Sequence, residues 1–301
     1  MGELSRAHLG MACWALLVGL SFPVVGLLDT LPPLLLTALR FVVACAGLIW
    51  LARGEAAFLP RGVQWGLYGL LGACLAGFFG AMFWAAHHTT ALAMATLFVS
   101  VPLLAYLIGL LLRVERLGWR LPAILALGAL GALGLALAEA RGPTPGLAFG
   151  RGEAVFFLGC VASACYPVLS KWGLSRGRLP ESAVVRTFWS LACGALLVGA
   201  LGLVLESPAR LIGLGWRDAL LIVYLGLGSS ALTFWLLQRA TALLGPATVT
   251  AYGYLVPFVS MLLLFVQMPS RIDWTWLPGS LLVLLAMGLL LRQGRASSVI
   301  G

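Results

Sequence analysis

Arg40 is a charged residue near the middle of an apolar run that extends from about Leu31 to Ala52. If this run crosses a membrane, a charged side chain at that depth costs at least about 2.5–3.5 kcal/mol. Arg40 should therefore face protein or water. Two roles fit: a counter-ion for a substrate carboxylate, or a structural arginine bonded to helix carbonyls or to an interfacial acid.

A second group of candidates lies in the next apolar run. His87 and His88 end this run, after Phe79, Phe83 and Trp84. Imidazoles titrate near neutral pH, so these histidines could line the path of a ligand. A polar cap on the helix end explains them equally well. His87 is the better candidate of the two because the same run carries the three aromatic rings.

Gly228-Ser229-Ser230-Ala231 loosely fits the GxSx motif of intramembrane serine proteases. His87 or His88 would have to supply the base, and such a dyad needs hydrogen-bond reach between the two side chains. The apolar runs hold no paired aspartates, which excludes an aspartyl protease. An intramembrane serine hydrolase is a remote alternative.

All acidic residues lie in loops or at the ends of apolar runs: Glu3, Asp29, Glu55, Glu115, Glu139, Glu153, Glu181, Glu206, Asp218 and Asp273. Proton-coupled transporters usually place a titratable residue inside the membrane, so facilitated or otherwise coupled export is expected instead. The six cysteines fall inside apolar runs, without the clustering of a metal site or the aqueous loops that disulfides need. No metal or cofactor is expected.

Composition excludes a soluble enzyme, a secreted domain and a disordered chain. The 301 residues are 61% hydrophobic and 10% charged, against roughly 45–50% and about 25% in ordinary globular domains. The mean hydropathy is +1.04. The net charge of +9 is spread along the chain, without the concentrated basic patch that nucleic-acid binding needs. The chain is therefore predicted to be an integral membrane protein with the lipid bilayer as its partner.

Ten segments are long enough to cross about 30 Å of hydrocarbon. They are residues 9–28, 31–52, 63–86, 91–112, 121–138, 154–170, 183–205, 219–238, 243–267 and 274–291. An all-α membrane protein with ten transmembrane helices is expected.

The positive charges predict the orientation, because cytoplasmic loops are enriched in Lys and Arg. With the N-terminus inside, the cytoplasmic segments carry Arg6, Arg53, Arg61, Arg113, Arg116, Arg120, Lys171, Arg176, Arg178, Arg239, Arg292 and Arg295, with Arg186 just inside the seventh span. The opposite side carries only Arg141, Arg151, Arg210, Arg217 and Arg271. Both termini are expected in the cytoplasm, in a bacterial inner membrane.

The two halves of the sequence repeat each other in order. Matching pairs are Pro23 and Pro167, Leu31-Pro32 and Leu179-Pro180, Phe83-Trp84 and Phe234-Trp235, Pro102 and Pro257, and Leu121-Pro122 and Leu277-Pro278. Each half has five spans, so the second copy enters the membrane upside down, as in many secondary transporters. The predicted organisation is a first repeat over 1–139, an extracytoplasmic linker over 140–153, and a second, inverted repeat over 154–301 around a central cavity.

The pattern resembles the ten-helix, EamA-type exporters of the drug/metabolite transporter superfamily. The resemblance rests on Ser21-Phe22-Pro23, Leu39-Arg40-Phe41, Thr89-Thr90-Ala91-Leu92-Ala93, Val114-Glu115-Arg116-Leu117, Tyr166-Pro167, Phe234-Trp235-Leu236-Leu237-Gln238-Arg239-Ala240, Gly245-Pro246-Ala247 and Tyr254-Leu255-Val256-Pro257. In the second repeat, Gln267-Met268-Pro269 stands where the family often has a Glu-Pro-like turn, so this signature occurs once, at Glu115.

The resemblance implies export of amino acids by alternating access, with aromatic and other apolar ones favoured, because exporters of aromatic amino acids are the most similar in length and aromatic content. Export of drugs or other small metabolites is the alternative. The expected substrate-binding residues are Trp14, Arg40, Phe79, Phe83, Trp84, His87, Ser100, Ser163, Tyr166, Trp235 and Tyr252. Pro23, Pro102, Pro167 and Pro257 are expected to act as hinges, although simple packing kinks would also explain them. The oligomeric state stays open, with a monomer plausible.

Overall fold

The structure is a computed structural model that describes residues 2–28, 30–55, 57–139, 150–269 and 273–297. Arg141 and Arg271, expected on the outer side, lie outside these ranges, as does most of the expected linker. The described residues form ten helices long and apolar enough to cross a membrane, which confirms the predicted count.

The first half contains α1 (Glu3–Gly26), α2 (Pro33–Ala52), α3 (Val63–Ala85), α4 (Ala91–Phe98), α5 (Val101–Leu111) and α6 (Arg120–Glu139). The second half contains α7 (Arg151–Ser175), α8 (Ala183–Leu205), η1 (Pro208–Leu211), α9 (Trp216–Tyr224), η2 (Leu225–Leu232), α10 (Thr233–Leu244), α11 (Pro246–Ala251), η3 (Tyr252–Tyr254), α12 (Leu255–Gln267), η5 (Trp274–Trp276) and α13 (Leu277–Ser297). Local signals begin several helices: the Thr90 and Ser182 hydroxyls cap α4 and α8, and Pro33 opens α2.

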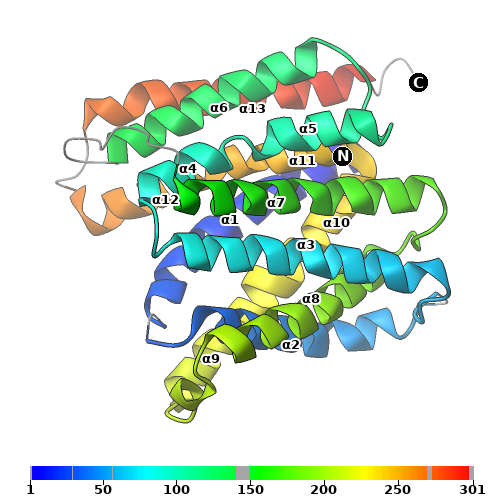
Figure 1. The fold of residues 1–301 in the computed structure, drawn as a ribbon. Helices are drawn as coiled ribbons and strands as arrows, with labels where there is room; N and C mark the ends of the chain where they lie inside the picture. Colours follow the sequence, from blue (N-terminus) through cyan, green and yellow to red (C-terminus); the bar gives the residue numbers. More distant parts are fainter. Residues whose placement is uncertain (1, 29, 56, 140–149, 270–272, 298–301) are drawn as a thin grey trace.

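Equivalent helices of the two halves make equivalent contacts. The helix α1 contacts α10 and α12, and its counterpart α7 contacts α3 and α5. The remaining counterparts, α2 with α8 and α6 with α13, pack against each other (Figure 1). This two-fold pattern is the one expected for two five-helix repeats of opposite orientation.

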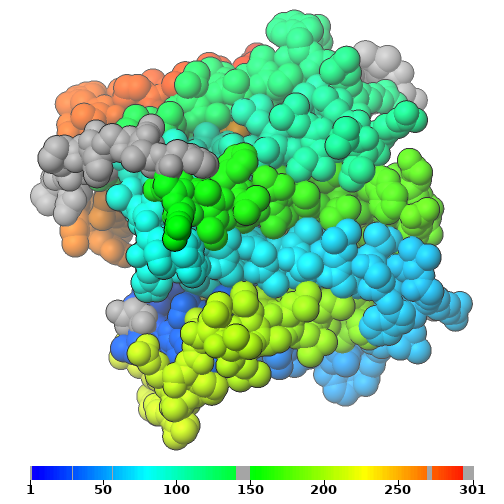
Figure 2. Space-filling view, viewed as in Figure 1, coloured from blue at the N-terminus to red at the C-terminus, as the bar shows by residue number. Residues whose placement is uncertain are grey.

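The bundle has two ends, named here by their helices. The N-terminal face holds the start of α1 and the ends of α2, α5, α7, α10 and α13, and the far face holds the opposite ends of these helices (Figure 1). On the side shown in Figure 2, α3 lies between α7 and α8. Large apolar side chains cover the outside of the bundle, such as Leu111 and Val204, which are 81% and 80% exposed. A surface of this kind suits lipid rather than water.

Small residues bring the helices together. A Cβ atom on Gly72 of α3 would lie 2.7 Å from Cys193 Cβ on α8, and one on Gly131 of α6 would lie 2.7 Å from the Val283 nitrogen on α13. Such close approach provides packing where lipid removes the hydrophobic driving force. Gly69, in the same run of small residues as Gly72, has no such neighbour within 4 Å.

Three spans are interrupted within the bilayer. The fourth span breaks between α4 and α5, just before Pro102, and the ninth passes through a 3-10 turn, η3, just before Pro257. The eighth span contains a π-helical segment, η2. The sequence patterns predicted continuous helices at all three places, because apolar periodicity does not distinguish these helix types.

Candidate substrate path

Arg40 lies on α2 beside the π-helical segment of the eighth span. Its Nη2 donates a 3.2 Å hydrogen bond to the Ser229 hydroxyl, and Ser229 is 8% exposed. The Nε of Arg40 is buried with no hydrogen-bond partner, and so is the hydroxyl of Ser230. Buried polar groups are normally satisfied, so the orphan Nε of Arg40 is a donor that suits an anionic ligand.

The contact between α2 and the π-helical segment is close. A Cβ atom on Gly226 would lie 2.5 Å from Val43 Cγ1 and 3.1 Å from the Arg40 carbonyl, and one on Gly47 would lie 2.5 Å from Leu227 Cδ2. π-helical segments often mark functional sites. Here the local widening places Ser229 and the guanidinium of Arg40 side by side near the middle of both spans.

Arg186, on α8, differs from Arg40 because its guanidinium is fully engaged. Nη1 donates to the carbonyls of Pro180 and Glu181 at 2.7 Å, Nη2 donates to the Gln238 carbonyl at 3.0 Å, and Nε donates to Gln238 Oε1 at 3.3 Å. Arg186 is 1% exposed. Its role is structural.

Gln238 extends this buried network into α7. Its Oε1 accepts a hydrogen bond from Ser170, and its Nε2 donates at 2.9 Å to the Tyr166 hydroxyl, which lies 2.8 Å from Ser190 Oγ. Tyr166 was among the residues predicted from the sequence, whereas Gln238 and Ser170 were not. A polar amide inside a predicted span was the available signal.

Aromatic rings form a continuous chain through the interior. The rings of Phe83 and Phe79 of α3 stack with their centres 6.2 Å apart. The Phe41 ring of α2 lies edge-on to two others, with its centre 5.6 Å from that of Phe79 and 5.8 Å from that of Phe234 of α10. Tyr166 completes the chain, 5.7 Å from Phe234. The structure thus brings together three of the predicted site residues, Phe79, Phe83 and Tyr166, in an aromatic wall that includes Phe41, the neighbour of Arg40 in the sequence.

A cavity of about 910 Å³ opens at the N-terminal face between elements of both halves. Its lining includes His8 of α1, Glu115 after α5, Lys171 of α7 and Thr248 of α11. Glu115 Oε1 accepts a 3.1 Å hydrogen bond from the Ala247 backbone nitrogen. Burial raises the pKa of the Glu115 carboxyl, against the opposing effects of the Ala247 N–H and the Lys171 charge.

A smaller cavity of about 310 Å³ lies at the far face. Phe83, Trp84 and His87, all predicted site residues, line it together with Glu206 and Arg210. The Glu206 carboxylate accepts hydrogen bonds from the Leu34 and Leu35 nitrogens at 2.8 and 2.9 Å, so it caps α2 from the other repeat. The aromatic chain therefore starts at Phe83 in one cavity and ends at Tyr166, on the same helix as Lys171 of the other cavity.

The other predicted residues have different contacts. Trp14 packs against the main core, and Ser163 is half-buried on α7. The Arg239 guanidinium lies 5.5 Å from the centre of the Trp235 ring. The Ser100 hydroxyl bonds to its own helix, at the Leu97 carbonyl.

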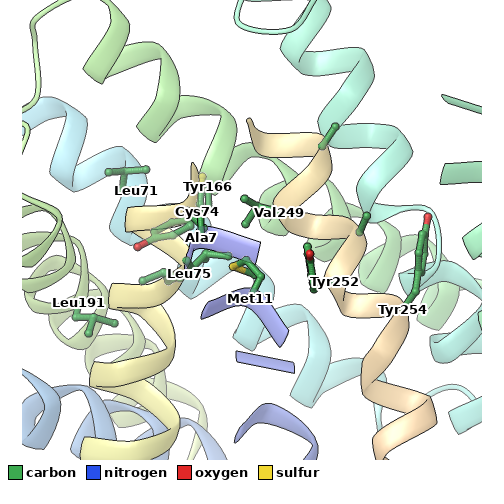
Figure 3. Packing of buried hydrophobic residues seen from close by; sticks show 14 of the residues in the cluster. Ala7, Met11, Leu71, Cys74, Leu75, Tyr166, Leu191, Val249, Tyr252 and Tyr254 are labelled. Carbon is green, nitrogen blue, oxygen red and sulfur yellow. The ribbon is translucent and has the colours of Figure 1, made fainter. Parts of the chain in front are cut away.

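Tyr252 projects toward α1 (Figure 3), and its hydroxyl lies 2.7 Å from His8 Nδ1. Pro102 and Pro257 follow the two helix interruptions described above, whereas Pro23 and Pro167 lie within continuous helices. The four prolines thus fall into two classes that their matched sequence positions do not distinguish.

The serine hydrolase alternative finds no support. Ser229 bonds to Arg40, while His88 stacks on Trp84 at 3.8 Å and His87 is exposed at the far face. Within the described ranges, no three His, Cys, Asp or Glu residues form a group that could hold a metal ion. The six cysteines are free.

The geometry defines a polytopic membrane protein with two five-helix repeats and cavities at both faces. The model of the EamA-like transporter family matches residues 5–137 and 150–292. The chain belongs to this family, and it is a membrane transporter rather than an enzyme. No curated protein matches it. A solved chain described only as "Crystal structure of protein" is 23% identical, with a TM-score of 0.77 over 97% of this chain and 98% of that one, a likeness that concerns the fold.

Proposed function

We propose that this transporter exports amino acids, with aromatic and other apolar ones favoured, and that Arg40 binds the substrate carboxylate. The observation that carries the proposal is the contrast between two arginines on membrane-spanning helices, the fully buried Arg186 and the partly buried Arg40. Arg186 has carbonyl and amide partners for all three nitrogens, whereas Arg40 has Ser229 alone and an orphan Nε. A guanidinium with unused donors matches the paired oxygens of a carboxylate.

The surroundings of Arg40 favour an apolar substrate side chain. Phe41, the next residue along α2, makes ring contacts with Phe79 and Phe234, and aromatic walls with few polar groups are typical of sites for small amphipathic ligands. A nucleotide sugar would need several cations along the path.

The presence of one cavity at each face supports transport by alternating access. The cavity at the N-terminal face is the larger one, so this conformation is more open there. Exposed arginines gather at the same face, among them Arg53, Arg61, Arg113, Arg116, Arg120, Arg176, Arg178 and Arg239. This asymmetry supports a cytoplasmic N-terminal face, with both termini inside and loading from the cytoplasm.

The test is counterflow of labelled phenylalanine in proteoliposomes, with and without a pH gradient. We expect saturable flux without a gradient, inhibited by tryptophan and leucine. Saturable flux that other metabolites inhibit and amino acids do not would assign a different substrate class. No flux of any amino acid would contradict the proposal.

A further inference from the structure

The cavity at the N-terminal face is lined by one acid and one lysine, which bond to the two ends of the connection between α10 and α11. Lys171 Nζ donates a hydrogen bond to the Ala242 carbonyl near the end of α10, and Glu115 Oε1 accepts one from the Ala247 nitrogen in the first turn of α11. These backbone anchors fix both side chains at the α10–α11 connection. No ion pair joins Glu115 to Lys171 in the described part of the chain.

Each group keeps hydrogen-bonding capacity for a ligand. An ammonium has three donors and a carboxylate about four acceptor positions, and each uses one of these in the bonds above. The site fits its carboxylate closely. Gly245 has a φ of +86°, and a Cβ atom there would lie 2.9 Å from Glu115 Oε1. A side chain at position 245 would therefore displace the carboxylate.

The rest of the lining is suited to an amphipathic solute. Glu115 is the one acidic residue among the lining residues, and Leu4, Leu121, Leu244 and Leu290 supply apolar surface. The volume of about 910 Å³ lies within the range of small-ligand sites. Arg116 and Arg120 also line it, but both are exposed to solvent, where screening weakens their effect.

We propose that this cavity is a loading site for zwitterionic amino acids, in which Glu115 binds the substrate ammonium and Lys171 binds the carboxylate. The inference rests on the proposed function and adds a second recognition step, separate from Arg40. A substrate would need both charges to load efficiently. Arg40, by contrast, binds only the substrate carboxylate.

The experiment compares three probes on the full chain in oriented membrane vesicles: phenylalanine, 2-phenylethylamine, which lacks the carboxylate, and 3-phenylpropionate, which lacks the ammonium. Inhibition of labelled phenylalanine flux is measured for Glu115→Gln and Lys171→Met, with Glu181→Gln and Arg178→Met as exposed controls outside the cavity lining. Lys171→Arg keeps the charge and serves as the rescue variant.

We expect Lys171→Met to raise the KM for phenylalanine at the N-terminal face about tenfold or more and to leave inhibition by 2-phenylethylamine unchanged. Glu115→Gln should also raise the KM for phenylalanine, but it should leave inhibition by 3-phenylpropionate unchanged, because this probe lacks the ammonium. Neither variant should change the KM at the far face, and Lys171→Arg should restore the wild-type value.

Equal shifts for all three probes, or no shift, would overturn the loading site while leaving wild-type phenylalanine flux, and hence the proposed function, intact. If neither Glu115→Gln nor Lys171→Met folds, Lys171→Arg provides the test. Wild-type selectivity among the three probes in Lys171→Arg would support the loading site, and an equal loss of inhibition by all three would overturn it. A wild-type protein that carries no amino acid would overturn the proposed function itself.

Discussion

The Tyr254 hydroxyl donates a 3.2 Å hydrogen bond to the Val99 carbonyl and so joins the interruptions of the fourth and ninth spans. Val99 lies between α4 and α5, and Tyr254 lies in the 3-10 turn between α11 and α12. The Tyr254 ring also fills the space next to Gly128 of α6, where a Cβ atom would approach Cδ2 to 2.5 Å. Each repeat thus supplies one partner of a link between two interrupted spans.

Tyr254→Phe keeps the ring and removes this link. The free energy of unfolding should fall by about 1 kcal/mol, measured by thermal or denaturant unfolding of the purified chain. Tyr224→Phe is the control, because Tyr224 is 45% exposed and its hydroxyl forms no hydrogen bond within the described residues. Equal stability of the two variants would contradict a structural role for the link.

Gly226→Ala should disturb the contact that positions Arg40. The added methyl group would meet Val43 at 2.5 Å, and overpacking of this kind costs about 1–3 kcal/mol. Affinity for phenylalanine should fall as well, since the π-helical segment carries Ser229. Gly228→Ala is the control, because a Cβ atom there would meet no atom nearer than 3.9 Å. This variant should change stability and flux little. Similar unfolding and flux of the two variants would contradict the prediction.

Gln238→Leu should be among the most destabilising single changes. It leaves Arg186 Nε, Ser170 and Tyr166 without one partner each, and each unsatisfied buried group costs about 1–3 kcal/mol. Gln64→Leu removes an exposed amide whose one bond is to the Arg61 nitrogen and serves as the matched control. The yield and unfolding midpoint of the folded protein report the difference, and a midpoint equal to that of the control would be inconsistent with this network.

Loading at the N-terminal face should depend on pH through Glu115. Burial raises the pKa of this carboxyl above its ordinary 4.5, so it becomes neutral at a higher pH than an exposed acid. A neutral Glu115 attracts a substrate ammonium less, and the KM for phenylalanine should therefore rise as pH falls through the raised pKa. The charged or titratable groups around it are Lys171 of α7, Arg116 of its own loop, Arg120 of α6 and His8 of α1.

Two variants separate these groups in the pH profile of KM. Glu115→Gln should remove the rise at low pH, whereas His8→Asn should retain it. A profile that loses its pH dependence with His8→Asn and keeps it with Glu115→Gln would assign the titration to the histidine.

The ten spans could be predicted because hydrocarbon thickness fixes the length of an apolar helix. The sixth span was predicted to end at Ser170, but α7 continues to Ser175, since helical hydrogen bonding continues past the polar residue Lys171. The π-helical segment was not predicted, because the apolar, glycine- and serine-containing sequence of Leu225–Leu232 is compatible with an α-helix as well as with a π-helix.

The candidate site was only partly accessible from the sequence. Arg40 was identified because a buried charge is costly in any apolar run. Its partner Ser229 is 189 residues away, and Glu115 is 132 residues from Ala247. Such pairs form only when the two repeats pack together, and a single sequence does not show that packing.

The most direct test of the account is phenylalanine counterflow with Arg40→Met, beside Arg217→Met as an exposed control at the far face. Loss of a charge-assisted pair should weaken phenylalanine affinity about 10- to 100-fold, while inhibition by 2-phenylethylamine stays unchanged and Arg40→Lys restores part of the affinity. Wild-type affinity for phenylalanine in a folded Arg40→Met protein would contradict the assignment of Arg40 as the carboxylate-binding residue.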